Sequence, residues 1–163
     1  MPRLLIVHHS PTRSMAALTE QVVSGAHDDA LEGVEVVVTE ALATTPEDLL
    51  AADGYVLGTP ANFGYMSGAL KHVFDTSFLR IGGALEENGA AGEGSAATAH
   101  RPFGLYVHGR YDVTGAVRSV LAITGALGWK QGFEVVEVIG DPATEHRERA
   151  YDLGGTIAAL LAG

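Results

Sequence analysis

Short apolar runs alternate with segments of helical spacing along the chain, and this alternation constrains the fold more than any other feature. Five runs, at residues 4–7, 34–39, 54–58, 103–107 and 133–139, have the composition of strands buried on both faces. Helical patterns follow them at residues 14–26, 46–50, 67–79, 114–127 and 145–161. Strands and helices that alternate through short connections form a parallel sheet covered by helices on both sides. The sequence therefore predicts a three-layer α/β/α fold with a five-stranded parallel sheet of order 2-1-3-4-5.

The expected helices carry local signals. Thr45 and Pro46 are suited to the N-cap and to the first helical position of the second helix. In the third helix, we expect four side chains to face the core: Leu70, Val73, Phe74 and Phe78. The length of 163 residues fits a single domain over residues 1–163. Residues 82–99 are rich in Gly, Ala, Glu and Ser without periodicity, which predicts a flexible surface insertion rather than a domain boundary.

The charge and composition exclude several classes of function. A net charge of -10 disfavours binding to nucleic acid and to anionic membrane surfaces, because both would repel the chain. The chain has no cysteine, so disulfides, thiolate catalysis and cysteine-ligated metal sites are excluded. No segment approaches the roughly 20 apolar residues of a membrane helix. The apolar run Leu4–Val7 is too short for the core of a signal peptide, and we expect a cytoplasmic protein.

A sheet of order 2-1-3-4-5 binds its ligand beyond the carboxyl ends of strands 1, 3 and 4, where the strand order reverses. The loop after strand 1, His8–Met15, leads into a helix and contains the hydroxyl residues Ser10, Thr12 and Ser14. Such hydroxyls can donate to a phosphate at the helix N-terminus or can simply cap the first turn. The chain lacks G-x-x-x-x-G-K-[ST] and G-x-G-x-x-G, which excludes a nucleoside-triphosphate loop and a dinucleotide fingerprint.

The loops after strands 3 and 4 combine backbone freedom with aromatic side chains. Segment Gly58–Gly68 contains a rigid proline, permissive glycines and two aromatic residues, so its backbone can approach a flat ring closely. In the segment His108–Asp112, Gly109 gives the same freedom and Tyr111 can stack on a ring. The same side chains can instead cover the sheet edge, form a subunit contact or make a solvated turn. The three loops together favour a ligand site more than any one of them alone.

The chain also resembles a known family. Segments Leu4–Met15, Gly54–Asp75 and Gly104–Gly128 are similar to the three conserved blocks of the flavodoxin superfamily. The most specific signal is GTPANFGYMSGALK, residues 58–71, followed by Phe74-Asp75. It resembles the NAD(P)H-dependent FMN reductase and quinone-reductase-like branch. The resemblance covers most of the chain except residues 82–99.

The resemblance implies a site for FMN, with the phosphate in the first loop and the ring between the other two. The implied cofactor-binding residues are Ser10, Thr12, Arg13, Ser14, Met15, Pro60, Ala61, Asn62, Phe63, Gly64, His108, Gly109, Arg110, Tyr111 and Asp112. The first loop departs from the family pattern, because Arg13 and Met15 stand where Gly and Thr are usual. One hydroxyl donor is thereby lost, and Arg13 is a candidate to replace it as a charged phosphate ligand.

The histidines do not predict a metal site. His8 and His9 are adjacent on an expected strand and would point to opposite faces, so they cannot both ligate one ion. A proton donor beside the flavin is a sharper hypothesis for His9 or His108. A serine hydrolase is also unsupported, because the chain has no G-x-S-x-G motif.

The preferred hypothesis is an FMN-binding oxidoreductase that passes electrons from NAD(P)H through FMN to a quinone or similar small-molecule acceptor. One alternative is a flavodoxin-type electron carrier, whose acidity would suit docking to basic redox partner proteins. A second alternative is a protein with this fold that has lost FMN and acts through protein contacts. The resemblance to flavin reductases also implies a homodimer or higher oligomer.

Overall fold

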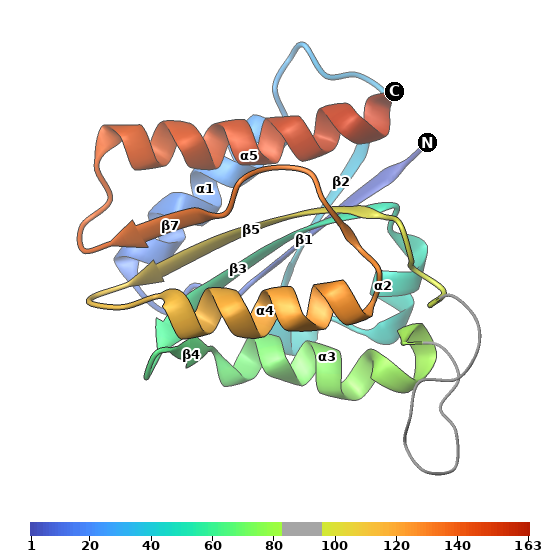
Figure 1. Cartoon of the computed structure of the whole chain (residues 1–163). Coiled ribbons are helices and arrows are strands. Elements are labelled where there is room, and N and C mark those ends of the chain that lie inside the picture. The colour runs from blue at the N-terminus through green and yellow to red at the C-terminus, as the bar shows by residue number, and fades with distance from the viewer. Residues whose placement is uncertain (83–95) are drawn as a thin grey trace.

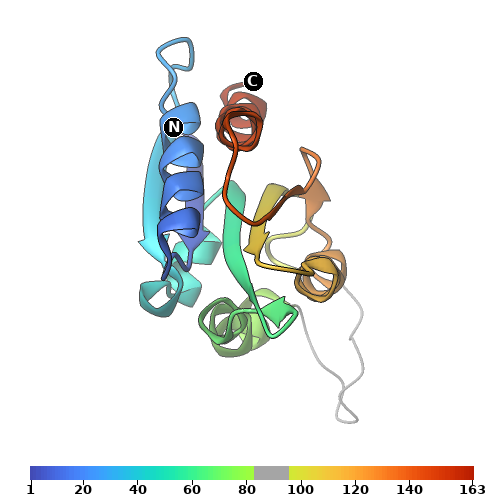
Figure 2. The same cartoon turned by 90° about the vertical axis from the view of Figure 1, so that its left-hand side faces the viewer.

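The computed structural model describes residues 1–82 and 96–163, which form one sheet covered by helices on both faces (Figures 1 and 2). The predicted three-layer arrangement is confirmed. The strands are β1 (Arg3–His8), β2 (Glu35–Glu40), β3 (Gly54–Asn62), β4 (Tyr65–Met66), β5 (Pro102–Gly109), β6 (Lys130–Gln131) and β7 (Val136–Ile139). The helices are α1 (Arg13–Ala26), the 3₁₀ turn η1 (Ala41–Ala43), α2 (Pro46–Ala51), α3 (Gly68–Ile81), α4 (Thr114–Ala126) and α5 (Thr144–Ala162).

The main strands are parallel and follow the order β2-β1-β3-β5, with β6 and β7 both paired to β5. This is the predicted order 2-1-3-4-5, since β6 and β7 together occupy the fifth position. Their carboxyl ends lie at one edge of the sheet, toward which the arrows of β5 and β7 point in Figure 1. Each helix returns the chain to the opposite edge, so α1, α4 and α5 all begin near the carboxyl edge.

The fifth strand differs from the prediction of one run over residues 133–139. Gln131 pairs with Phe103 and Val136 pairs with Tyr106, so four residues, 132–135, face only two residues of β5. Helix α5 packs closely here, because a Cβ on Gly132 would meet Leu160 at 2.7 Å. The run therefore leaves the ladder and rejoins it as β7.

The third strand is longer than the predicted 54–58. It continues to Asn62 and turns back into β4, with Ala61 paired to Met66 and Asn62 paired to Tyr65. The expected loop is therefore a β-hairpin that extends past the carboxyl edge. Alternation of small and aromatic residues over so few positions carries too little periodicity to predict it.

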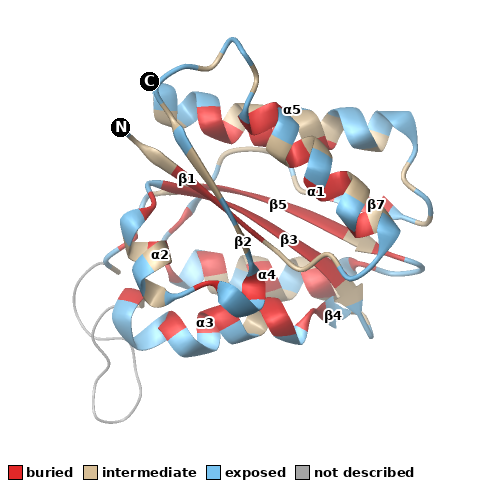
Figure 3. Cartoon of the chain, turned by 180° about the vertical axis from the view of Figure 1, so that it is seen from behind, coloured by how far each residue is buried: buried red, intermediate tan, exposed pale blue. Residues whose placement is uncertain are grey.

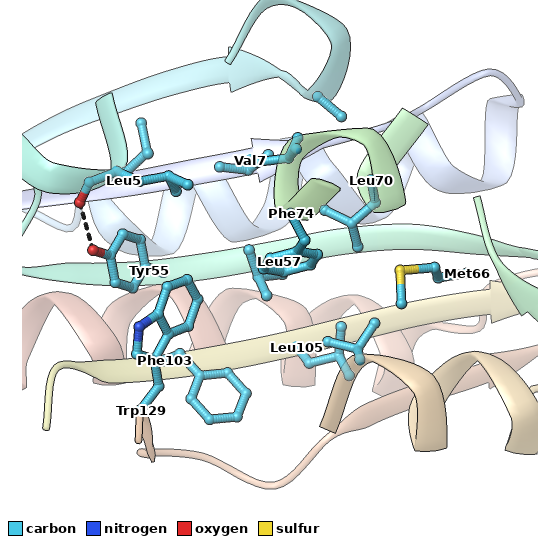
Figure 4. Packing of buried hydrophobic residues seen from close by; sticks show 14 of the residues in the cluster. Leu5, Val7, Tyr55, Leu57, Met66, Leu70, Phe74, Phe103, Leu105 and Trp129 are labelled. Atoms are coloured by element: carbon cyan, nitrogen blue, oxygen red, sulfur yellow. Dashed lines mark hydrogen bonds between the residues drawn. The ribbon is translucent and has the colours of Figure 1, made fainter. Parts of the chain in front are cut away.

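Two apolar cores lie on the two faces of the sheet. One core joins α1 and α5 to the sheet through residues such as Leu18, Val22 and Ile157, and the other lies beneath α2, α3 and α4. In Figure 3 the central strands β1, β3 and β5 are buried while the outer sides of the helices are exposed. In the second core, Trp129 stacks on Tyr55 with ring centroids 3.9 Å apart (Figure 4).

Most local predictions hold, with two corrections. Thr45 caps α2 as expected, and its capping box is completed by Asp48. Phe78 was expected to point inward from α3 but is half exposed, because Ser77 and Ile81 occupy the buried side of that turn. The predicted insertion, residues 82–99, lies mostly outside the described residues. The C-terminal end of this segment does not lie on the surface. Thr98 is fully buried, and its hydroxyl accepts a hydrogen bond from the indole N–H of Trp129 at 2.7 Å.

Candidate functional site

The loops after β1, β3 and β5 converge on a hollow of about 290 Å³ at the carboxyl edge of the sheet. The turn after β7 forms its remaining wall. Eight of the residues proposed from the sequence line this hollow: Thr12, Ser14, Pro60, Ala61, Asn62, His108, Gly109 and Arg110. Gly140 and Asp141 also line it, and neither was predicted from the sequence. Both could have been predicted, because Gly140 and Asp141 directly follow the last strand, which ends at the same edge of the sheet.

The first wall is the N-terminus of α1. Thr12 is its N-cap, and its hydroxyl oxygen accepts a hydrogen bond from the Met15 N–H at 3.2 Å. Within residues 1–82 and 96–163, the backbone N–H groups of Arg13 and Ser14 have no acceptor. The first turn contains no acidic residue. Free N–H groups at a helix N-terminus favour an anion, and this end of α1 opens toward the hollow.

Two residues of the predicted phosphate loop lie elsewhere. The Met15 side chain is fully buried in the core under α1, so it cannot reach a ligand in the hollow. Met15 replaces a polar residue of the family pattern, and its apolar side chain is drawn into the core by the hydrophobic effect. Ser10 also points away from the hollow, because its hydroxyl bonds to His8 Nδ1 at 2.8 Å and to Thr19 Oγ1 at 2.8 Å.

The Ser10 hydroxyl belongs to a chain of four hydrogen-bonded side chains beneath the loop. Thr19 Oγ1 continues the chain to the hydroxyl of Tyr106, at 2.7 Å. His8, Gly58 and Tyr106 are paired neighbours on β1, β3 and β5, so they form one row across the sheet. The Tyr106 ring lies over Gly58, where a Cβ would meet the ring at 2.1 Å. Burial raises the pKa of Tyr106 and, despite nearby Glu40, lowers the pKa of His8.

The second wall is the β3–β4 hairpin. Its two central residues, Phe63 and Gly64, have φ of 51° and 77°. Such a pair of positive φ values is typical of type I′ turns, which favour Asn, Asp or Gly at the first position. An aromatic residue in this conformation costs about 1–2 kcal/mol. The Phe63 side chain is fully exposed, so packing within the chain does not offset that cost. Strain of this kind is found at functional sites.

The hairpin is held firmly at its base. The Thr59 hydroxyl accepts a hydrogen bond from the Ser67 N–H at 2.9 Å, and Ser67 in turn caps α3. Gly115 lets α4 approach the hairpin, since a Cβ there would meet the Gly64 carbonyl oxygen at 2.2 Å. The exposed tip of the hairpin therefore projects from a base that is fixed by hydrogen bonds and close packing.

The third wall is the turn after β5. His108 Nε2 donates to the Gly140 carbonyl at 2.7 Å, and the Gly140 N–H donates to the Gly109 carbonyl at 2.9 Å. These bonds fix the distance between the ends of β5 and β7. Tyr111 is 85% exposed at the rim. The Asp112 carboxylate accepts a hydrogen bond from the Thr114 N–H, which holds the pKa of Asp112 below its usual range.

Besides Ser10 and Met15, five residues of the predicted site do not line this hollow: Arg13, Phe63, Gly64, Tyr111 and Asp112. His9, one of the two suggested proton donors, lines a different hollow of about 270 Å³ with Ser10 and Glu40. His108 lines the site, but its Nε2 proton is held by the Gly140 carbonyl. This bond fixes the orientation of the His108 ring at the wall of the hollow.

A larger hollow of about 470 Å³ lies between α1 and α5, away from the carboxyl edge. Its polar groups are partly paired, since the Tyr151 hydroxyl donates to Asp28 at 2.5 Å. None of the three ligand loops reaches it. In the described part of the chain, no group of three or more His, Cys, Asp or Glu residues could hold a metal ion. No described helix is long and apolar enough to cross a membrane.

Comparison with solved structures identifies the architecture. A flavodoxin from the domain Archaea superposes with a TM-score of 0.75 at 14% identity, covering 99% of both chains. This chain has a flavodoxin-like fold. The Flv1 flavodiiron core from Synechocystis sp. PCC6803 also superposes, with a TM-score of 0.73 and 14% identity over 98% of this chain and 36% of that one.

Sequence comparison adds a local match within this flavodoxin-like fold. A curated flavodoxin from Aquifex aeolicus (strain VF5) is 36% identical over 75 residues, which are 46% of this chain and 40% of that protein. The match thus spans less than half of the curated relative's length. No protein-family model matches the chain. The fold is therefore established, and the identity of the ligand has to be inferred from the residues of the site.

Proposed function

We propose that this chain binds one FMN in the hollow at the carboxyl edge and carries electrons between redox partner proteins. The observation that carries the proposal is the convergence of three loops on the 290 Å³ hollow, bordered by two exposed aromatic side chains, Phe63 and Tyr111. Ligands of doubly wound folds bind at such a point. The partial sequence match to a flavodoxin supports FMN as the ligand.

The phosphate end of the hollow fits the FMN phosphate. The N–H groups of Arg13 and Ser14 and the hydroxyls of Thr12 and Ser14 are available as donors. Thr12 accepts from the Met15 N–H through its oxygen, which leaves the hydroxyl proton free to donate. These donors compensate for the missing hydroxyl at position 15. The phosphate would sit at the positive end of the α1 dipole.

The outer part of the site fits a flat ring. FMN supplies reversible electron transfer through its isoalloxazine ring. Pro60 borders the hollow but has no N–H group. The backbone of Ala61–Asn62 and of Gly109–Arg110 also borders it, and N–H groups there can bind the ring edge. Phe63 and Tyr111 are exposed on the rim, and we expect them to flank the ring and exclude water from it. A ring contact would also offset the strain at Phe63.

The carrier hypothesis is preferred over a reductase for two reasons. The partial relative and the solved neighbours include flavodoxins. The net charge of -10 suits docking to basic partner proteins through long-range attraction. The second candidate is an NAD(P)H-dependent FMN or quinone reductase with a small-molecule acceptor, formed as a homodimer. The resemblance of segment 58–71 to that branch supports it.

The test begins with a titration of flavin-free protein with FMN, followed by quenching of flavin fluorescence. Riboflavin, which lacks the phosphate, is the ligand control. We expect FMN to bind more tightly than riboflavin, and Ser14→Ala to weaken FMN about fivefold while leaving riboflavin unchanged. Absence of FMN binding at high concentration would overturn the proposal and leave the alternative of a fold that has lost its flavin.

The second step separates the two functions. FMN-loaded protein is mixed with NADH or NADPH under anaerobic conditions while its visible spectrum is recorded. A carrier keeps its oxidised spectrum and is reduced only by a redox partner or a chemical reductant. Rapid bleaching by reduced nicotinamide would replace the carrier with the reductase. In that case, the measurement continues with a quinone as acceptor and with the molecular mass of the protein in solution.

A further inference from the structure

A second hollow adjoins the first on the side of α5. It has a volume of about 290 Å³ and is lined by Arg13, Ser14, Ala17, Asp141, Pro142 and Arg147. Ser14 and Asp141 line both hollows, so the two spaces share a wall. A ligand group in the second hollow would therefore be a direct neighbour of the proposed FMN phosphate.

Among the described residues, neither arginine of this hollow forms an ion pair with a carboxylate. Within residues 1–82 and 96–163, the ion pairs engage other cations: Arg3, Lys71, Arg80 and Arg149. Asp141 supplies the only acidic side chain of the lining, which leaves two guanidinium groups against one carboxylate. In a chain with twice as many acidic as basic residues, 20 against 10, this local excess of positive charge is unusual.

The placement of both arginines is unfavourable for the chain by itself. Arg13 begins α1 and Arg147 lies in the first turns of α5, where the helix dipoles disfavour positive charge. The two like charges also face one space. Both arginines are exposed, and no ion pair within the described residues offsets either cost. An anion in the hollow would remove both costs at once, and guanidinium groups match the oxygens of a phosphate.

We propose that the second hollow binds a second phosphate group, held by Arg13 and Arg147 beside the phosphate of the flavin. The inference extends the proposed function and rests on it for the identity of the first ligand. The second phosphate has two possible sources. It belongs either to the distal phosphate of a flavin dinucleotide, which would enter through the shared wall, or to a separate phosphorylated molecule.

The experiment compares Arg147→Gln with Arg149→Gln. Both variants remove one positive charge from α5, but Arg149 pairs with Glu134 and does not line the hollow. Flavin-free protein is titrated with FMN and with FAD. FMN-loaded protein is titrated separately with inorganic phosphate by isothermal calorimetry. If the source is a dinucleotide, Arg147→Gln weakens FAD about tenfold, changes FMN less than about threefold, and Arg149→Gln changes neither.

If the source is a separate molecule, FAD has no advantage. Inorganic phosphate then binds to the FMN-loaded protein, and Arg147→Gln weakens this binding about tenfold relative to Arg149→Gln. The proposal is overturned if Arg147→Gln and Arg149→Gln behave alike in both titrations. Failure of the protein to bind FMN or FAD concerns the proposed function instead. The phosphate titration of flavin-free protein then decides the second hollow through the same pair of variants.

Discussion

The close contact between Gly58 and Tyr106 gives a sharp prediction for the variant Gly58→Ala. A Cβ at position 58 would lie 2.1 Å from Tyr106 Cζ and 2.3 Å from its hydroxyl oxygen. Carbon atoms in contact are normally about 3.5–4 Å apart. Tyr106 is fully buried between the sheet and α1, so its ring cannot move aside without displacing its neighbours.

The magnitude follows from two effects. Overpacking of a core costs about 1–3 kcal/mol. Displacement of the ring also breaks the 2.7 Å hydrogen bond between Tyr106 and Thr19 and leaves buried hydroxyls unpaired, which costs about 1–3 kcal/mol. The lower entropy of the unfolded chain with Ala offsets about 0.4–1 kcal/mol. We therefore expect Gly58→Ala to lower the free energy of unfolding by about 2–5 kcal/mol.

The assay is urea unfolding followed by the fluorescence of Trp129, the only tryptophan, which is buried against Tyr55. Gly68→Ala is the matched control. Gly68 begins α3, and a Cβ there has no atom within 4 Å. The control is expected to leave stability unchanged or raise it by up to about 1 kcal/mol.

A double-mutant cycle tests the cause. In a Tyr106→Leu background the obstructing ring is absent, and Gly58→Ala should then cost less than about 1 kcal/mol. The explanation would be refuted if Gly58→Ala were as stable as the wild type, or if it cost the same in both backgrounds. Equal costs would locate the effect in the backbone of β3 rather than in the ring of Tyr106.

Three further outcomes follow from the site. Phe63→Asn should raise the free energy of unfolding by about 1 kcal/mol in urea titrations, because Asn tolerates positive φ, and should weaken FMN binding because the ring contact is lost; equal FMN affinity would remove Phe63 from the site. Ser10→Ala should lower stability by about 1 kcal/mol yet leave FMN affinity within about twofold, since its hydroxyl belongs to the buried chain. Burial lowers the pKa of His8 in the folded state, so the unfolded state binds the proton more readily. The urea concentration at the unfolding midpoint should therefore decrease as the pH falls below about 6.5. The decrease should be smaller in His8→Gln than in His72→Gln, a control at an exposed histidine.

The fold was predictable from the sequence because its signals are repeated along the chain. Each buried parallel strand is an uninterrupted apolar run, and each covering helix has a polar outer side, as in Leu4–Val7 followed by α1. Where a single element departs from this rule, the prediction was wrong. The bulge at residues 132–135 depends on how closely α5 packs, which is a tertiary effect with no local pattern. The β3–β4 hairpin has a turn residue, Phe63, that turn preferences disfavour.

The position of the candidate hollow was predictable for a similar reason, because the order of strands fixes where the connections leave the sheet. The roles of individual side chains were not. Ser10 and Thr12 are both hydroxyl residues of the same loop, two positions apart, yet one is bonded inward to His8 and the other opens toward the hollow. Only the row formed by His8, Gly58 and Tyr106 across the sheet explains the difference, and that row exists only after the strands have paired.

Three residues that break local rules lie at the carboxyl edge of the sheet. Phe63 is strained and exposed at the rim, and Arg13 and Arg147 stand at helix ends that disfavour them. Each of these choices lowers the stability of the chain alone. One other non-glycine residue in the described part of the chain, His100, has a positive φ, of 69°, and it lies away from this edge, before β5. A ligand with a flat ring and anionic groups would offset all three costs, since it supplies a partner for the aromatic ring and counter-charges for the guanidinium groups. These three unfavourable placements therefore support the proposed site independently of any resemblance.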